Sequence, residues 1–164
     1  LIYTLLGEGD ESWLTSTLVE DKHLAIGATC DFLTQRYPGL FIISAICAPN
    51  KELPLRQAIL DKLQELRSRR LTKEELDVIK RRLYTSFAFT NETFLDQVGS
   101  IGFYAMIDNY RFAFDYTDLV RSITPEEIQA VARRYLDPDH HSVVIVRPTR
   151  SQGHTEAYLP WPLG

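Results

Sequence analysis

Histidine is the residue type best suited to bind a metal or to move protons at neutral pH, and the chain has four. His140 and His141 are adjacent, whereas His23 and His154 stand apart. None belongs to H-E-x-x-H or H-x-x-E-H, the helical spacings that place two imidazoles and a glutamate around one zinc ion. His154 comes nearest, because a glutamate lies two residues further on, but it has no second ligand. We therefore expect four solvated turn residues, with no metal ligand and no catalytic residue among them.

Nucleophilic and acidic side chains give no catalytic signature either. Cys30 and Cys47 each lie in an apolar segment, where a free thiol behaves as a small hydrophobic group. A symmetric turn near residues 37–39 could place them side by side, but we expect two thiols because no second pair forms a disulfide framework. No G-x-S-x-G motif occurs, and adjacent carboxylates such as those at 74–75 are typical of helix N-termini. By its motifs, the chain does not carry out catalysis alone.

The composition is that of one globular domain. The 164 residues are 45% apolar and 24% charged, and they can bury a core without disulfides or metals. The net charge is −4, and the basic runs at 67–70 and 80–82 lie within acidic helical segments, so we expect no nucleic-acid partner. No apolar run reaches the roughly 20 residues of a membrane span, so we expect no membrane partner. Residues 1–6 resemble the end of a helix, and we interpret the chain as a piece of a longer protein.

The first half of the chain predicts a helix followed by a hairpin. Ser12 is a good N-cap for a helix that ends near residue 21. The alternation of residues 24–33 predicts a half-buried strand, and the nearly continuous apolar run at 40–48 predicts a central strand covered on both faces. A turn at 35–39 joins the two strands.

The second half predicts helices and one closing strand. Helical periodicity covers 54–67, 72–87, 94–105, 112–122 and 124–135, with capping boxes at Thr72 and Thr124. Phe94, Val98, Ile101 and Ala105 form one predicted buried stripe, with close packing at Gly99 and Gly102. Residues 142–147 predict a buried strand that closes the sheet. The order of elements indicates an α+β fold, with a mostly antiparallel sheet covered by helices on one face.

Several ordered segments resemble the insulinase or pitrilysin family of zinc peptidases, which includes the mitochondrial processing peptidase. These segments are LGEGDESWL (6–14), LVEDKHLAI (18–26), PGLF (38–41), CAP (47–49), LTKEEL (71–76), ITPEEI (123–128) and ARRYLDPD (132–139), followed by 143–148. The resemblance covers residues 1–149. It implies an inactive domain of C-terminal type that lacks its first strand, and it leaves 150–164 as a C-terminal extension.

The resemblance implies a division of labour between domains. In this family H-x-x-E-H in another domain binds zinc and hydrolyses the peptide, so this chain is expected to hold no cofactor itself. Relatives often place an Arg and a Tyr, seven residues apart, near the substrate, and these positions fall on Val19 and Ile26 here. Trp13 likewise stands where relatives often carry an Arg. Because neither Val nor Ile can donate a side-chain hydrogen bond, we expect no substrate-binding residue in this chain.

Three hypotheses follow. The first is a non-catalytic domain of a zinc metalloendopeptidase, which forms the chamber wall, a substrate-enclosing surface and the interface with a catalytic domain in the same or another chain. The second is a structural or assembly subunit of the same fold without proteolysis, and the third is an unrelated α+β ligand-binding domain. Peptide would be the substrate of the whole assembly, and an unpaired sheet edge favours a homodimer of the fragment. The resemblance points to bacteria and leaves periplasm and cytoplasm open.

Overall fold

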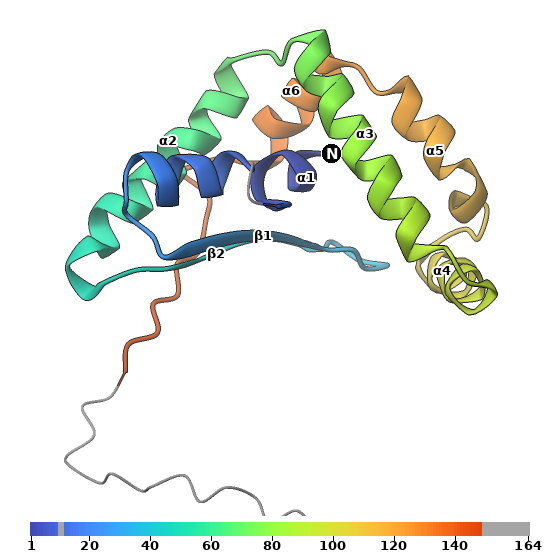
Figure 1. Cartoon of the computed structure of the whole chain (residues 1–164), viewed down its shortest axis with the longest axis horizontal. Coiled ribbons are helices and arrows are strands. Elements are labelled where there is room, and N and C mark those ends of the chain that lie inside the picture. The colour runs from blue at the N-terminus through green and yellow to red at the C-terminus, as the bar shows by residue number, and fades with distance from the viewer. Residues whose placement is uncertain (10–11, 149–164) are drawn as a thin grey trace, which may run out of the picture.

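The computed structural model describes residues 1–9 and 12–148. Figure 1 shows a two-stranded hairpin at the base, with α1 and η1 lying on it and α2 and α3 forming an arch above. The elements are, in chain order, α1 (Ile2–Gly7), the π-helix η1 (Thr15–Asp21), β1 (Gly27–Leu33), β2 (Leu40–Ile46), the 3-10 helix η2 (Pro49–Lys51), α2 (Glu52–Ser68), α3 (Lys73–Thr90), α4 (Phe94–Ile107), α5 (Phe112–Ser122) and α6 (Pro125–Tyr135).

The hairpin is antiparallel and has helices on one face. In its register Cys30 lies opposite Ile43. Alternation along β1 buries Ala28 and Cys30 toward α1 and η1, whereas Thr29 and Asp31 face outward and are exposed. This period of two is the expected signature of a half-covered strand. The α+β fold with an antiparallel sheet covered by helices on one face is therefore confirmed.

The hydrophobic core lies between the hairpin and the helices α1, η1, α2 and α6. Leu6, Leu14 and Leu18 have no exposed surface, and each fully buried leucine contributes about 1.5–3 kcal/mol. Ile128 and Ala132 of α6 belong to the same core, and α6 packs against α2. The N-terminal segments are thus integral to the core.

The predicted helix starts are confirmed at the two capping boxes. Thr72 Oγ1 accepts from the Glu75 backbone at 3.2 Å, and Glu75 Oε2 accepts from the Thr72 backbone at 2.8 Å. The same reciprocal pair joins Thr124 and Glu127 at the start of α6. Each box satisfies backbone N–H groups that the first turn leaves without helical partners.

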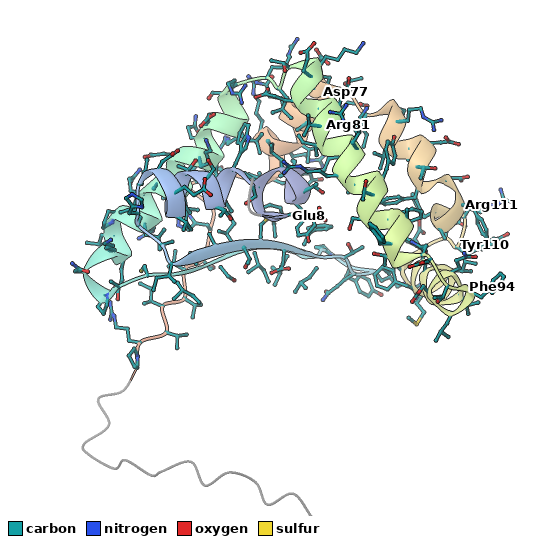
Figure 2. All side chains as sticks on the ribbon, in the orientation of Figure 1. Glu8, Asp77, Arg81, Phe94, Tyr110 and Arg111 are labelled. Carbon is teal, nitrogen blue, oxygen red and sulfur yellow. The ribbon has the colours of Figure 1, made fainter. Side chains whose placement is uncertain are left out.

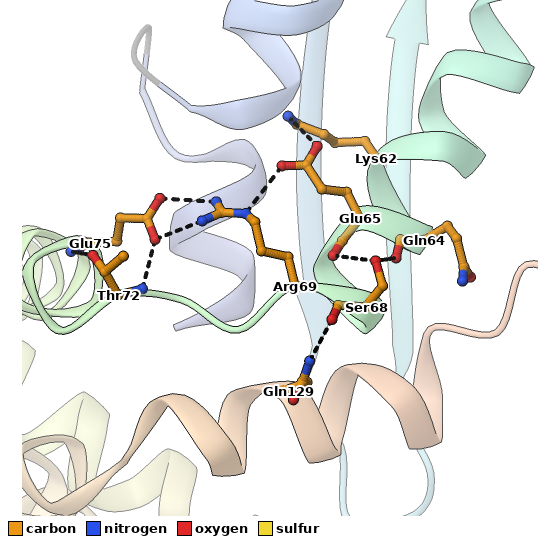
Figure 3. Close-up of polar contacts among 8 residues, drawn as sticks. All are labelled: Lys62, Gln64, Glu65, Ser68, Arg69, Thr72, Glu75 and Gln129. Atoms are coloured by element: carbon orange, nitrogen blue, oxygen red, sulfur yellow. Dashed lines mark hydrogen bonds and ion pairs between the residues drawn. The ribbon is translucent and has the colours of Figure 1, made fainter.

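A polar network joins α2 to the helices around it (Figure 3). The Arg69 guanidinium donates to both carboxylate oxygens of Glu75, at 3.0 and 2.9 Å, and lies 3.5 Å from a Glu65 carboxylate oxygen. From α6, the Gln129 side chain donates to the Ser68 carbonyl at 3.0 Å. On the other side, Trp13 lies under the Arg69 guanidinium, 5.0 Å from the ring centroid. The network fixes the turn between α2 and α3, at the top of the arch.

The prediction of a buried closing strand at 142–147 is wrong. This segment is extended but forms no strand in the described part of the chain, and Val144 and Val146 are 86% and 89% exposed. Its β-branched residues favour an extended backbone, but a strand forms only by pairing with another strand, and the observed sheet consists of β1 and β2 without this segment. Arg147 is held beside α2 by hydrogen bonds to both carboxylate oxygens of Glu52, one of them at 2.9 Å.

Three other packing predictions are also wrong. Helix α4 has no buried residue, and Phe94 and Val98 of its predicted stripe are largely exposed. Among the described residues no heavy atom lies within 4 Å of a Cβ built at Gly99 or Gly102, so these glycines are not close-packing sites. Strand β2 is covered on one face only, because helices lie on one side of the hairpin, and its last residue Ile46 is exposed. Periodicity identified the apolar faces but not what covers them.

Candidate functional site

The stretch from residue 18 to 26 folds back on itself between η1 and β1. The backbone N–H groups of Leu24 and Ala25 both donate to the Leu18 carbonyl, at 2.8 and 3.0 Å. His23 has a φ of 48°, in the left-handed region that few non-glycine residues adopt. Lys51 Nζ donates to the His23 carbonyl at 2.6 Å and ties this turn to the end of the hairpin. These hydrogen bonds therefore fix the backbone between Val19, which lies in η1, and Ile26, which directly precedes β1.

Val19 and Ile26 differ in exposure. Val19 is half-buried against the core, whereas Ile26 is 76% exposed and its backbone N–H donates to the Ile46 carbonyl at 2.7 Å. Their aliphatic side chains offer no hydrogen-bond donor or charge to a bound peptide.

The described histidines lie in turns and have exposed rings bonded to local groups. His23 Nδ1 is 3.0 Å from the Val19 carbonyl, and His140 Nδ1 is 2.8 Å from the Asp137 carboxylate. His141 donates from Nδ1 to the Pro138 carbonyl at 2.6 Å. His154 lies outside the described residues. Within residues 1–9 and 12–148 no group of three or more His, Cys, Asp or Glu side chains could hold a metal ion.

Both cysteines are free thiols, as predicted. Because Cys30 lies opposite Ile43 in the register, the side-by-side arrangement of Cys30 and Cys47 does not occur. Burial, followed by the negative charge of the neighbouring Asp31, raises the pKa of the Cys30 thiol to about 12. A thiol with so high a pKa is a poor nucleophile at neutral pH.

A cavity of about 540 Å³ lies where α1, α3, α4 and α5 meet, and sequence reasoning did not find it. Its walls come from four separate elements, so no local motif marks it. Figure 2 shows Glu8 between α1 and α3, at the edge of this region. The cavity is lined by Tyr3, Glu8, Leu83, Ser86, Phe87, Thr90, Asn91, Leu95, Asp96, Gly99, Ser100, Phe103, Tyr104 and Tyr116.

An apolar surface, which we call the α4 patch, covers the outer side of α4. Phe94 and Leu95 are 87% and 80% exposed, and Val98 and Met106 continue the surface. Figure 2 shows Phe94 at the end of the arch farthest from α2. A run of exposed aromatic and aliphatic side chains of this kind typically marks an interaction surface.

No helix in the described ranges is long and apolar enough to cross a membrane.

Comparison with known proteins identifies the family. The sequence model described as the peptidase M16 inactive domain matches residues 1–83, half of the chain. The chain therefore belongs to the family of inactive domains of M16 peptidases. This agrees with the resemblance to zinc peptidases seen in the sequence.

Particular relatives come from bacteria. The chain is 28% identical over 145 residues to a Helicobacter pylori protein named zinc protease PqqE, an alignment that covers 88% of this chain. It is 27% identical to a protease from Helicobacter pylori of known crystal structure, with a TM-score of 0.75 over 84% of this chain and 33% of that one. The inactive peptidase domain of a Bordetella parapertussis protein has the same fold, with a TM-score of 0.81 over 92% of this chain and 82% of that one at 22% identity.

The chain spans about a third of the length of PqqE, the curated relative that it matches. The name of that relative describes a zinc protease, whereas the domain shared with this chain matches an inactive family.

Proposed function

We propose that this chain serves as a non-catalytic domain of a zinc metalloendopeptidase. In this role it forms part of the chamber wall, encloses the substrate and contacts a catalytic domain that carries H-x-x-E-H and zinc. The observation that carries the proposal is the match to the inactive M16 domain over residues 1–83. The name of the Helicobacter pylori relative supports the link to a zinc protease.

The α4 patch is the surface that we assign to the contact with the catalytic domain. Its side chains project from a helix that buries no residue of its own, so a partner could cover them without disturbing the core. A stable protein interface buries about 800 Å² on each side and places aromatic side chains such as Phe94 at its centre.

The experiment mixes the purified chain with an H-x-x-E-H domain of the same family from the same genome. We expect the chain alone to bind no stoichiometric zinc and to cleave no peptide. The mixture should sediment as a complex, and amide exchange should slow in residues 94–107. Phe94→Lys should weaken the complex at least about tenfold, the effect of losing one central anchor.

Leu53→Lys is the control, because Leu53 is a strongly exposed apolar residue of α2, and α2 lies on the opposite side of the arch from α4 (Figure 1). It should leave the complex unchanged. Stoichiometric zinc in the chain alone, lost on substitution of His140 or His141, would disprove the proposal.

A structural or assembly subunit without proteolysis is the second candidate. The aliphatic side chains at Val19 and Ile26 favour it, since they provide no polar contact to a substrate. Peptide hydrolysis by the complex discriminates between the two functions: a stable complex without hydrolysis would support the assembly role.

A further inference from the structure

We propose that residues 158–163 of this chain, which read YLPWPL, dock on the side of the hairpin that the helices leave open. We call these residues the YLPWPL segment, and they lie outside the described residues. The surface, which we call the outer face, has Leu33, Leu40, Ile42 and Ile46 as its apolar members. The contact is made within one chain, so the inference does not rest on the proposed role in a peptidase.

Strand β2 is apolar on both of its faces. Phe41, Ile43 and Ala45 pack against the core, and the residues that alternate with them point to the opposite side. Leu40 and Ile46 are 61% and 68% exposed there, and β2 contains no charged residue. A strand with one solvated face normally carries polar side chains on that face. The sequence of β2 is therefore that of a strand with both faces covered, whereas helices cover only one.

The register shows how the outer face is composed. Leu33 of β1 lies beside Leu40, and Ile46 lies opposite Gly27, which adds no side chain of its own. Between these apolar ends the face also includes Thr29 and Asp31, whose side chains are exposed. A ligand that suits this face is apolar and carries a few hydrogen-bond donors.

The chain after α6 leads to the outer face. Figure 1 shows it passing from the helical side of the hairpin to the open side. The hydrogen bonds of Arg147 to the Glu52 carboxylate hold it at the start of α2. Only the 3-10 helix η2 separates α2 from the region where β2 ends, at Ile46. The described chain therefore stops beside one end of the outer face.

The YLPWPL segment can reach the whole outer face from this point. Residues 149–157, which read TRSQGHTEA, can span about 30 Å when fully extended and about 15–18 Å as a flexible coil. The seven residues of β2 span about 24 Å. The polar linker thus matches the distance from Arg147 to the far end of β2.

The composition of the YLPWPL segment suits a face better than a sheet edge. Pro160 and Pro162 lack backbone N–H donors, so the segment is a poor partner for an edge strand. Each proline favours an extended backbone in the residue before it, namely Leu159 and Trp161. In an extended segment Leu159, Trp161 and Leu163 share one side, with the same period of two as the outer face.

Two further properties favour this occupant. The Tyr158 hydroxyl and the Trp161 indole N–H are donors on largely apolar side chains, and the Asp31 carboxylate on the outer face is an acceptor. Attachment through a short linker also gives the segment an effective concentration in the millimolar range. A second copy of the chain, at lower concentration, would compete poorly for the same surface.

The test is methyl NMR of the full chain, compared with the variant Trp161→Ser. We expect the methyl resonances of Leu40, Ile42 and Ile46 to shift on substitution, because the indole ring no longer lies over them. The same shifts should be found at low and high protein concentration. Met106→Ser is the control, since it removes an exposed apolar side chain of α4, and it should leave these resonances unchanged.

A substitution on the outer face tests the same contact from the other side. Leu40→Lys should lower the ratio of docked to free segment about tenfold, the effect of losing one apolar contact, and should move the Trp161 indole N–H resonance toward its position in the free segment. Phe89→Lys is the matched variant, because Phe89 is a similarly exposed apolar residue of α3, and it should leave that resonance in place. Circular dichroism checks that both variants are folded.

Several outcomes would overturn the inference. Unchanged hairpin methyl resonances in Trp161→Ser, or equal effects of Leu40→Lys and Phe89→Lys, would show that the YLPWPL segment does not contact the outer face. Shifts that disappear on dilution would assign the face to a second copy of the chain. Shifts of the same methyl groups that occur only after addition of the catalytic domain would assign it to that partner.

Discussion

Gly7 at the end of α1 lies directly against Cys30 in β1. A Cβ built on Gly7 would lie 2.2 Å from the Cβ of Cys30 and 2.4 Å from its backbone nitrogen. Real carbon and nitrogen atoms that are not bonded do not approach so closely, so a side chain at position 7 would push the helix off the hairpin. This contact sets how closely α1 packs on the hairpin. The core lies between the hairpin and the helices.

Gly7→Ala should therefore destabilise the fold. Overpacking of this kind costs about 1–3 kcal/mol in the free energy of unfolding, and backbone contacts give little room for relaxation. Urea denaturation followed by circular dichroism measures the change.

Gly102→Ala provides the opposite case, because the described residues leave open space around Gly102 in the middle of α4. Alanine has the higher helix propensity, so this substitution should stabilise the chain by about 0.5–1 kcal/mol. Equal decreases in the free energy of unfolding for Gly7→Ala and Gly102→Ala would show that the contact with Cys30 does not limit the packing.

Glu75→Ala should destabilise the chain by about 1–2 kcal/mol, because one carboxylate both closes the capping box with Thr72 and accepts two hydrogen bonds from Arg69. Glu126→Ala removes another carboxylate that contacts an arginine, Arg70, but this pair is more exposed and should contribute under about 0.5 kcal/mol. Thermal unfolding of the two variants compares them directly. A larger loss for Glu126→Ala would contradict the importance of the network in Figure 3.

Stability should fall in acid through Asp137. Hydrogen bonds from His140, then from the Asp139 backbone and Arg67, lower the pKa of the Asp137 carboxyl to about 2. A carboxyl whose pKa is lower in the folded state stabilises the protein above the unfolded pKa of about 3.9 and loses that contribution as pH falls toward 2. Asp137→Asn should flatten the dependence of Tm on pH between 4 and 2. The same slope in both proteins would assign the acid sensitivity to other carboxyls.

The sequence specified local features better than distant ones. The capping boxes at Thr72 and Thr124 were predicted because each needs only four consecutive residues. The strand predicted at 142–147 does not form, because Val144 and Val146 favour an extended backbone but do not determine whether the segment pairs with the sheet. The cavity beside Glu8 was missed for a related reason, since Tyr3, Phe87 and Tyr116 come together only through the packing of separate helices.

The positions of Val19 and Ile26 allow a direct test of whether polar side chains there could confer activity. The double substitution Val19→Arg with Ile26→Tyr should leave the chain folded, because Ile26 is exposed and Val19 is only partly buried. We expect neither peptide hydrolysis nor bound zinc in the isolated chain, since the substitutions add hydrogen-bond donors but no metal ligand set. Fluorogenic peptide assays and metal analysis measure both quantities, with Ile26→Phe as the control that adds a ring without a hydroxyl. Turnover by the double variant alone would show that this chain provides its own catalytic groups.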